Sequence, residues 1–204
     1  MVKYPKNILT LIAYLKKLPG IGTKTAERFA FEIIKWNNAE LSAFGNLLIK
    51  LKESIKNCDK CGCLKEDNRC YFCSDDKRKR EIMCIIASPK DAYSIEDTNS
   101  FHGLYHVIDN LISPMDGFYL DEKVIEKIEK RISENNVKEI VIALDSTLEG
   151  DATALFLKNR FKKKVLNKSD LIISRLAFGI PVGSSLEYID GGTLSKAFVG
   201  RQNF

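Results

Sequence analysis

The 204-residue sequence contains no run of about 18 apolar residues, the length that a helix needs to cross a bilayer. Its N-terminal stretch lacks the small-residue cleavage site of a signal peptide and continues directly into a helical pattern. Internal repeats and low-complexity tracts are also missing. These absences, with 45% hydrophobic residues, predict a folded cytoplasmic protein that has no membrane segment.

Histidine and tryptophan are scarce. The two histidines, His102 and His106, lie four residues apart, a spacing that can form a metal pair, but no co-ligand stands out beside them. We therefore interpret both as structural. The single tryptophan, Trp36, falls near the end of a predicted helix, where we expect it in the core rather than as a platform for base stacking.

Cysteine, by contrast, occurs six times, and four copies form the pattern C-x2-C-x8-C-x2-C at Cys58, Cys61, Cys70 and Cys73. Two cysteines at this spacing form a tight knuckle, and two knuckles can surround one zinc ion tetrahedrally. In a reducing compartment such paired thiols bind metal more often than they form disulfides. We predict a closed zinc site that supports folding and leaves no position for water. The alternative is a set of unrelated buried thiols.

The other two cysteines do not fit this spacing. Cys63 lies inside the loop and is interpreted as a spare thiol or substitute ligand, and Cys84 as core packing in an apolar strand.

Charge is unevenly distributed along the chain. Residues 1–80 carry 17 Lys/Arg against 9 Asp/Glu, whereas residues 81–204 carry 15 against 18. A basic first half suits a polyanion, above all nucleic acid. The alternative is a solvated lysine-rich surface.

The first third of the chain has helical periodicity. Helices are predicted at 5–18, from Thr23 onward and at 39–56, the first of them ending before Pro19. Their inward faces are expected to comprise Ile8, Leu11, Ile12, Leu15, Ala26, Phe29, Ala30, Ile33, Ile34, Leu41, Phe44, Leu48, Leu51 and Ile55.

Between the first two of these helices lies Leu-Pro-Gly-Ile-Gly. Gly20 and Gly22 permit close approach of a backbone, and the following helix presents unpaired N–H groups at the positive end of its dipole. Lys24 and Arg28 lie four residues apart on one helix face, where they can contact the same phosphate backbone. This pattern is typical of helix–hairpin–helix proteins that bind DNA without reading sequence. The alternative is an ordinary glycine-rich turn.

Beyond residue 80 the pattern changes to short apolar strands alternating with helices. Strands are predicted at 82–86, 139–144 and 171–173, and helices around 124–132, 150–161 and 193–200. This alternation predicts a largely parallel sheet. The charge run at 75–80 is interpreted as a domain boundary.

Acidic residues follow the second of these strands. Asp145 comes at its carboxyl end, where α/β sheets place their ligand sites, and Glu149 and Asp151 fall at the next helix start. Such a trio can hold Mg²⁺. Helix capping is the alternative, and Ala87 stands where a carboxylate after the first strand would strengthen the metal hypothesis.

Taken in order, five blocks resemble the RecR family of bacterial recombination mediators over nearly the whole chain. They are LPGIGTKTAERFAF, the four cysteines, FHGLYHVIDNLISPMDG, LEGDATALFLK and IPVGSSLEYIDGGTLSKAFVGR. The resemblance implies an α+β multi-domain protein with a helix–hairpin–helix domain at 1–56, a zinc finger at 57–76, a Toprim domain at 80–175 and a C-terminal assembly segment at 176–204.

The resemblance also implies a function. RecR-like proteins form rings, often tetramers, that encircle DNA, and they act with RecO and RecF to load RecA on single-stranded or gapped DNA. The family is not known for catalysis. Its DNA-contacting pair corresponds to Lys24 and Arg28, and its RecO-binding Toprim acids to Asp145, Glu149 and Asp151.

The sequence departs from the family pattern only in its second half. Ala87 replaces a usual Glu, Asp145-Ser146 a usual Asn-Pro, Phe178 an Arg, and Ser184-Ser185 a Gly-Asp pair. The hairpin and the cysteines are intact, so DNA and zinc binding are expected. Nicking or primase-like chemistry is put in doubt by these departures, and altered partner contacts are expected from them.

Three hypotheses follow from the sequence. The favoured one is a zinc-containing, nucleoid-associated DNA mediator without catalysis. The alternatives are a Mg²⁺-dependent Toprim enzyme centred on Asp145, Glu149 and Asp151, and a purely structural zinc adaptor.

Overall fold

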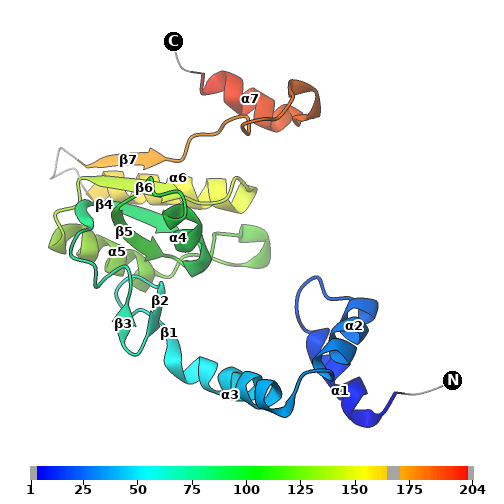
Figure 1. The fold of residues 1–204 in the computed structure, drawn as a ribbon. Coiled ribbons are helices and arrows are strands. Elements are labelled where there is room, and N and C mark those ends of the chain that lie inside the picture. The colour runs from blue at the N-terminus through cyan, green and yellow to red at the C-terminus, as the bar shows by residue number, and fades with distance from the viewer. Residues whose placement is uncertain (1–3, 165–170, 202–204) are drawn as a thin grey trace. The chain divides into compact units, whose positions relative to one another are not determined.

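The computed structural model describes residues 4–164 and 171–201. By its internal contacts the chain divides after Ile55 into two compact units, a helical one before this residue and an α/β one after it. Both are drawn in Figure 1. None of the helices in the described ranges combines the length and apolar character of a membrane span.

The helical unit comprises α1 (Lys6–Leu15), α2 (Thr23–Ile33) and α3 (Asn38–Ser54). Its small core lies between α1 and α2, where Ile12 packs against Ala26 and Ala30, neither of which has exposed surface. The alanines let the two helix backbones approach closely. The first helix ends three residues earlier than predicted, because tighter turns replace α-helical bonds ahead of Pro19.

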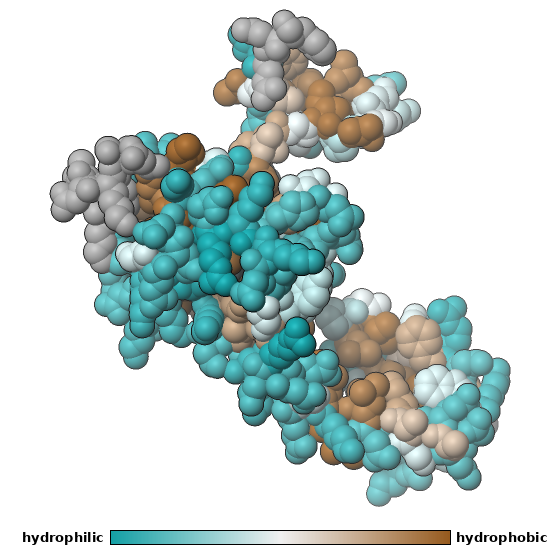
Figure 2. Space-filling model, turned by 60° about the vertical axis from the view of Figure 1, so that its left-hand side comes forward, coloured by the Kyte–Doolittle hydropathy of each residue, from teal (hydrophilic) through white to brown (hydrophobic). Residues whose placement is uncertain are grey.

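The inward faces predicted for α2 and α3 are only partly correct. Phe29 and Ile34 of the second helical segment are 37% and 50% exposed. No residue of α3 is buried, although a capping box between Asn37 and Glu40 starts this helix well. Trp36, expected in the core, is 37% exposed and meets a neighbouring ring edge-on. Apolar side chains of this unit are therefore visible on its surface in Figure 2.

The α/β unit contains two sheets. Strands β1 (Ile55–Asn57), β2 (Leu64–Glu66) and β3 (Arg69–Cys70) form a small sheet in the order β1-β2-β3. Apart from the first two residues of β1, it belongs to the segment 57–76, which we call the cysteine module. The main sheet has the order β5-β4-β6-β7, all neighbours parallel, with β4 (Lys79–Ile86), β5 (Gly103–Val107), β6 (Glu139–Ala143) and β7 (Ile172–Arg175). A parallel sheet was predicted, and it is confirmed.

Helices and short turns complete this unit. They are α4 (Pro89–Glu96), the 3-10 turn η1 (Pro114–Asp116), α5 (Glu122–Glu134), α6 (Leu148–Lys164), the turn η3 (Leu186–Tyr188) and α7 (Gly191–Val199). Ser88 and Asp91 form a capping box that starts α4 directly after β4.

The two faces of the main sheet have different covers. Met83 and Ile85 of β4 point into a core formed with α5 and α6. Cys84 and Ile86, which alternate with them, point into a second core formed with α4 and the cysteine module. Cys84 is 2% exposed, which confirms its prediction as core packing. The cysteine module therefore serves as part of the cover of the main sheet.

The charge run at 75–80, interpreted from the sequence as a domain boundary, is structured: β4 already begins at Lys79, and Arg78 is buried. Strand β5 was not predicted: its five residues are buried on both faces, so no polar–apolar alternation marks it in the sequence.

Candidate metal centre and nucleic-acid interface

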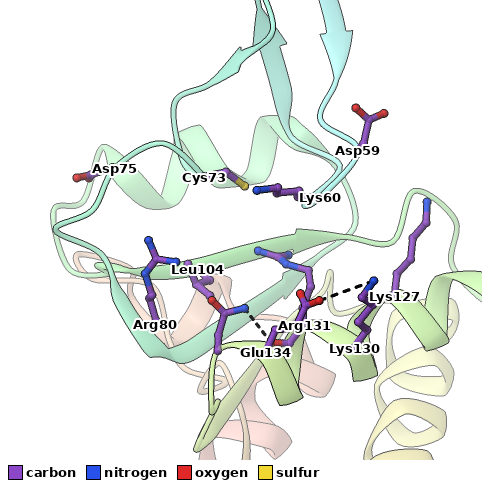
Figure 3. Close-up of a pocket in the computed structure, with 11 residues that line it drawn as sticks. Asp59, Lys60, Cys73, Asp75, Arg80, Leu104, Lys127, Lys130, Arg131 and Glu134 are labelled. Atoms are coloured by element: carbon purple, nitrogen blue, oxygen red, sulfur yellow. Dashed lines mark hydrogen bonds and ion pairs between the residues drawn. The ribbon is translucent and has the colours of Figure 1, made fainter.

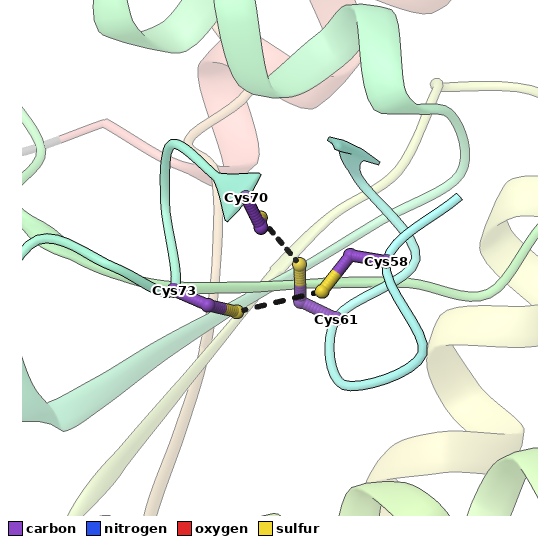
Figure 4. A group of neighbouring side chains, drawn as sticks. All are labelled: Cys58, Cys61, Cys70 and Cys73. Atoms are coloured by element: carbon purple, nitrogen blue, oxygen red, sulfur yellow. Dashed lines mark hydrogen bonds between the residues drawn. The ribbon is translucent and has the colours of Figure 1, made fainter. Parts of the chain in front are cut away.

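The sulfur atoms of Cys58, Cys61, Cys70 and Cys73 all lie within 4.8 Å of one another. The Sγ atoms of Cys58 and Cys73 are 3.9 Å apart, and those of Cys61 and Cys70 are 3.6 Å apart, as Figure 4 shows. A Zn–S bond of about 2.3 Å implies S···S edges of about 3.8 Å in a tetrahedron. The four thiols predicted as ligands thus fit one zinc ion, and three of them are buried.

Backbone hydrogen bonds shape the first knuckle. The Cys58 N–H donates to the Cys63 carbonyl at 2.6 Å, and the Gly62 N–H donates to the Cys58 carbonyl at 2.8 Å. Gly62 has a φ of +77°, and a Cβ at this position would lie 2.7 Å from the Val107 Cβ. Glycine is therefore required both by the turn and by the close approach of β5.

The thiols perturb one another strongly. Hydrogen bonds from Cys61 and Cys73 lower the pKa of the Cys70 thiol, whereas hydrogen bonding to Cys63 and Cys70 raises the pKa of Cys61. Such opposed shifts arise because several thiolates cannot be close together without a cation. A dication bound there favours the ionised form of all its ligands. Cys63 is fully buried beside this group but is not one of the four.

The cysteine module packs directly on the main sheet. The Val107 N–H donates to the Cys61 carbonyl at 2.8 Å. Phe72, 2% exposed, lies with its ring centre 5.0 Å from that of Tyr105 and 5.3 Å from that of Tyr93. These contacts tie both knuckles to β5 and α4, so the metal site and the α/β fold share one core.

A buried ion pair joins the same elements. Arg78 donates to both carboxylate oxygens of Glu96, at 3.0 and 2.6 Å, and to the Gly103 carbonyl at 3.0 Å. Tyr105 donates to Glu96 at 2.8 Å. Burial alone would raise the pKa of Glu96, but the bonds from Arg78 and Tyr105 hold it below its ordinary value. No local signal in the sequence predicts the pairing of Arg78 with Glu96, because the two residues are 18 positions apart.

The glycine turn before α2 leaves a helix end open. Gly20 has a φ of +77°, and Gly22 is the N-cap residue of α2, whose first turn has neither a side-chain cap nor an acidic residue. Space for a Cβ is free at both glycines. Lys24 and Arg28 are exposed on α2, and neither forms an ion pair within the described chain. The four residues predicted for DNA binding thus lie together, with uncapped N–H groups beside two unpaired cations.

The acidic trio does not gather. The four cysteines are the single group of three or more possible metal ligands within the described residues, so Asp145, Glu149 and Asp151 form no second one. Thr147 accepts a hydrogen bond from the Gly150 N–H at 3.1 Å, which caps the start of α6. Asp145 is exposed and Glu149 half-buried.

Asp151 is occupied by two cations from later in the chain. Arg175 of β7 donates to it at 2.6 Å and Lys196 of α7 at 3.4 Å, and the Arg175 bond leads the effects that lower its pKa. Lys196 also donates to Ser146 at 2.9 Å. Both cations also lie over the Phe178 ring, with the Arg175 Cζ 4.6 Å and the Lys196 Nζ 4.4 Å from its centre. Ser146 and Phe178 are two of the departures from the family pattern. Both contact Lys196, the cation that α7 contributes.

The two histidines are not a metal pair. His106 is 3% exposed, and burial, with nearby Arg131 and Lys127, lowers its pKa to about 3. It therefore stays neutral and accepts a hydrogen bond from Arg131 at 2.9 Å. His102 is exposed. The structural role predicted for His106 is confirmed.

Comparisons with known proteins agree with this architecture. Three family models match, described as RecR helix-hairpin-helix over residues 8–51, Toprim domain over 81–177 and RecR C-terminal over 179–202. Proteins called Recombination protein RecR are 47% identical in Protochlamydia amoebophila, 45% in Chlamydia felis and 43% in Chlamydia pneumoniae, and each alignment covers all of both chains. The chain therefore belongs to the RecR family.

Proposed function

We propose that this protein is a recombinational DNA-repair mediator that binds DNA backbone without reading sequence and breaks no bonds. The observation that carries the proposal is the open start of α2, where uncapped N–H groups, Gly20 and Gly22 lie beside exposed Lys24 and Arg28. This arrangement offers backbone donors and positive charge to phosphates, which are the same for every sequence. Zinc is the proposed ion of the cysteine module, whose closed four-thiolate set suits a structural role.

Changing Lys24 and Arg28 to Ala is expected to weaken DNA binding for all sequences. Each lost phosphate contact should reduce the slope of log K against log salt by about 0.9 on duplex DNA, so about 1.8 for the pair. The measurement is fluorescence anisotropy of labelled duplexes across a salt series. Lys50→Ala/Lys52→Ala is the matched control, because both lysines are exposed in the same unit on α3. Equal slopes for the Lys24/Arg28 variant and the parent would disprove the hairpin assignment.

The partners proposed are RecO-like and RecF-like proteins that help to load RecA on single-stranded or gapped DNA, with the protein acting as a homotetrameric ring at the nucleoid. Family membership supports this proposal, as does the exposed acidic surface of the Toprim domain. Asp145 and Glu149 are available for a partner, whereas Asp151 is neutralised by Arg175 and Lys196 in the same chain.

Replacing Asp145 by Asn and Glu149 by Gln is expected to weaken binding of a RecO-like protein, since two accessible acidic groups are lost. Titration calorimetry with the purified partner measures this, and Asp116→Asn is a control on an exposed turn of the same unit.

The parent is expected to leave supercoiled plasmid intact with Mg²⁺. Mg²⁺-dependent nicking that disappears in Asp145→Asn would instead establish the enzymatic alternative.

A further inference from the structure

A cleft of about 540 Å³ lies within the α/β unit, between the cysteine module and α5. Figure 3 shows Lys60 entering it from the first knuckle and Arg131 from α5, and Lys127 of α5 lines its edge. The cleft belongs neither to the glycine turn nor to the Toprim acidic residues. Its volume is in the range of ligand sites in proteins.

The acidic side chains that line the cleft form ion pairs, whereas several of its basic side chains do not. Its acidic residues have cationic partners: Asp59 pairs with Lys65 at 2.6 Å, Asp75 with Arg78 at 3.7 Å and Glu134 with Lys130 at 3.7 Å. Lys60, Lys127 and Arg131 form no ion pair with any carboxylate of the described chain. The cleft therefore holds three cations that form no ion pair within the described chain.

Arg131 is held in place before any ligand arrives. It is 9% exposed, and its Nη1 donates to the Tyr105 carbonyl at 2.7 Å and to Nδ1 of His106 at 2.9 Å. Both acceptors are uncharged, because His106 stays neutral. Buried arginines are normally paired with an anion. Both of these bonds come from Nη1, which holds the guanidinium in a fixed position. Arg131 lines the cleft, as Figure 3 shows, and no carboxylate of the described chain is paired with its charge.

We propose that this cleft binds the phosphate groups of a nucleic-acid strand or a nucleotide through Arg131, Lys60 and Lys127. A phosphate suits a fixed guanidinium fork because it accepts two parallel hydrogen bonds, and two mobile ammonium groups add positive charge at its rim. For its DNA source the inference rests on the proposed function. It adds a second phosphate-binding site in the α/β unit. The glycine turn of the helical unit does not imply such a site.

One competing explanation comes from the metal. Four thiolates around Zn²⁺ carry a net charge of about −2, and Cys73 lines the cleft. Lys60 and Arg131 would then serve as counter-charges of the metal centre rather than as ligand-binding groups. Zinc content separates the two explanations, because counter-charges of the thiolates affect metal retention and phosphate-binding lysines do not.

The test uses the full-length, zinc-loaded protein and changes only exposed lysines. Lys60→Ala/Lys127→Ala removes two cations of the cleft but leaves Arg131 and its bonds to β5 intact. Lys123→Ala/Lys158→Ala is the matched control, with two exposed lysines removed from α5 and α6 outside the cleft. Zinc per chain, the salt dependence of binding to single-stranded DNA, and the shift of the unfolding temperature by ATP are measured for both.

If the ligand is a strand, the salt slope of the cleft variant should be smaller than that of the control by about 1.4, from two contacts at about 0.7 each. If the ligand is a nucleotide, the DNA slope stays unchanged and ATP stabilises the parent and the control but not the cleft variant. Either result supports the site. Two results would overturn it: equal DNA slopes and equal ATP shifts in the cleft variant and the control, or a loss of zinc that is confined to the cleft variant.

A failure of the proposed function gives a different pattern. If the parent binds no DNA, the Lys24→Ala/Arg28→Ala experiment fails as well, and the ATP measurement alone decides on the cleft. If the parent binds DNA with a slope that depends on Lys24 and Arg28 but not on Lys60 and Lys127, the proposed function stands and the strand source is rejected.

Discussion

Removal of zinc by a chelator is expected to abolish the cooperative unfolding transition of the α/β unit. Structural zinc sites contribute about 10–16 kcal/mol of binding free energy, whereas whole domains are stable by about 5–15 kcal/mol. In this protein the ligands are also part of the core. Cys61 has no exposed surface, and the cluster that it shares with Phe72, Tyr105 and Val107 covers one face of the main sheet. Without the ion, that cover loses its central connection.

Circular dichroism during heating, before and after chelation, measures this effect, and native mass spectrometry gives zinc per chain together with the number of chains. We expect one zinc per chain and four chains. Cys70→Ser should lose the metal and the transition, whereas Cys84→Ala should keep both and cost about 1 kcal/mol, the typical effect of a single substitution. Cys84 is a fair control because it is equally buried in the same cluster but is not a ligand. An unchanged midpoint in the chelated protein would refute the structural role of the metal.

The four-cysteine cluster could be predicted from the sequence because its geometry is local. The two cysteines of each pair have two residues between them, and this spacing fixes a knuckle. The two pairs are joined by a hairpin whose turn residues, Asp67 and Asn68, have positive φ values of 47° and 62°. The order of β4, α5, β6, α6, β7 and α7 was predictable for the same reason, since each of these elements carries its own apolar pattern, whereas β5 was missed. The capping box of α4 is a further local signal.

Contacts between distant segments could not be predicted in this way. The position of the cysteine module depends on Gly62 meeting Val107, and the neutralisation of Asp151 depends on Lys196, 45 residues later. No local pattern encodes either pairing. The apolar face of α3 shows a related limit. Periodicity identifies this face but not what covers it, and Phe44 and Leu48 on it are 41% and 55% exposed.

Arg78 illustrates how much a single such contact can contribute. Its side chain is 5% exposed, and its guanidinium is bound by Glu96 and by the Gly103 carbonyl. It also lies over the rings of Phe72 at 5.0 Å and Tyr105 at 5.5 Å. Its Nε is the one buried side-chain polar atom without a hydrogen bond in the described residues. Arg78 therefore connects the cysteine module with α4 and β5.

Replacing Arg78 by Met is expected to lower the free energy of unfolding by about 3–5 kcal/mol, the usual cost of removing one partner from a buried ion pair. The loss comes mainly from Glu96, whose carboxylate is only 25% exposed and is left without its counter-charge. Arg80→Met is the control: its pair with Asp76 is exposed on both sides, so about 0–1 kcal/mol is expected. Chemical denaturation of the zinc-loaded variants measures both values. Adding Glu96→Gln to Arg78→Met should recover part of the stability, because it removes the uncompensated charge. Equal losses for the two arginine variants would refute a large contribution of Arg78. A large loss without recovery in the double variant would show that Arg78 contributes by packing rather than by its charge.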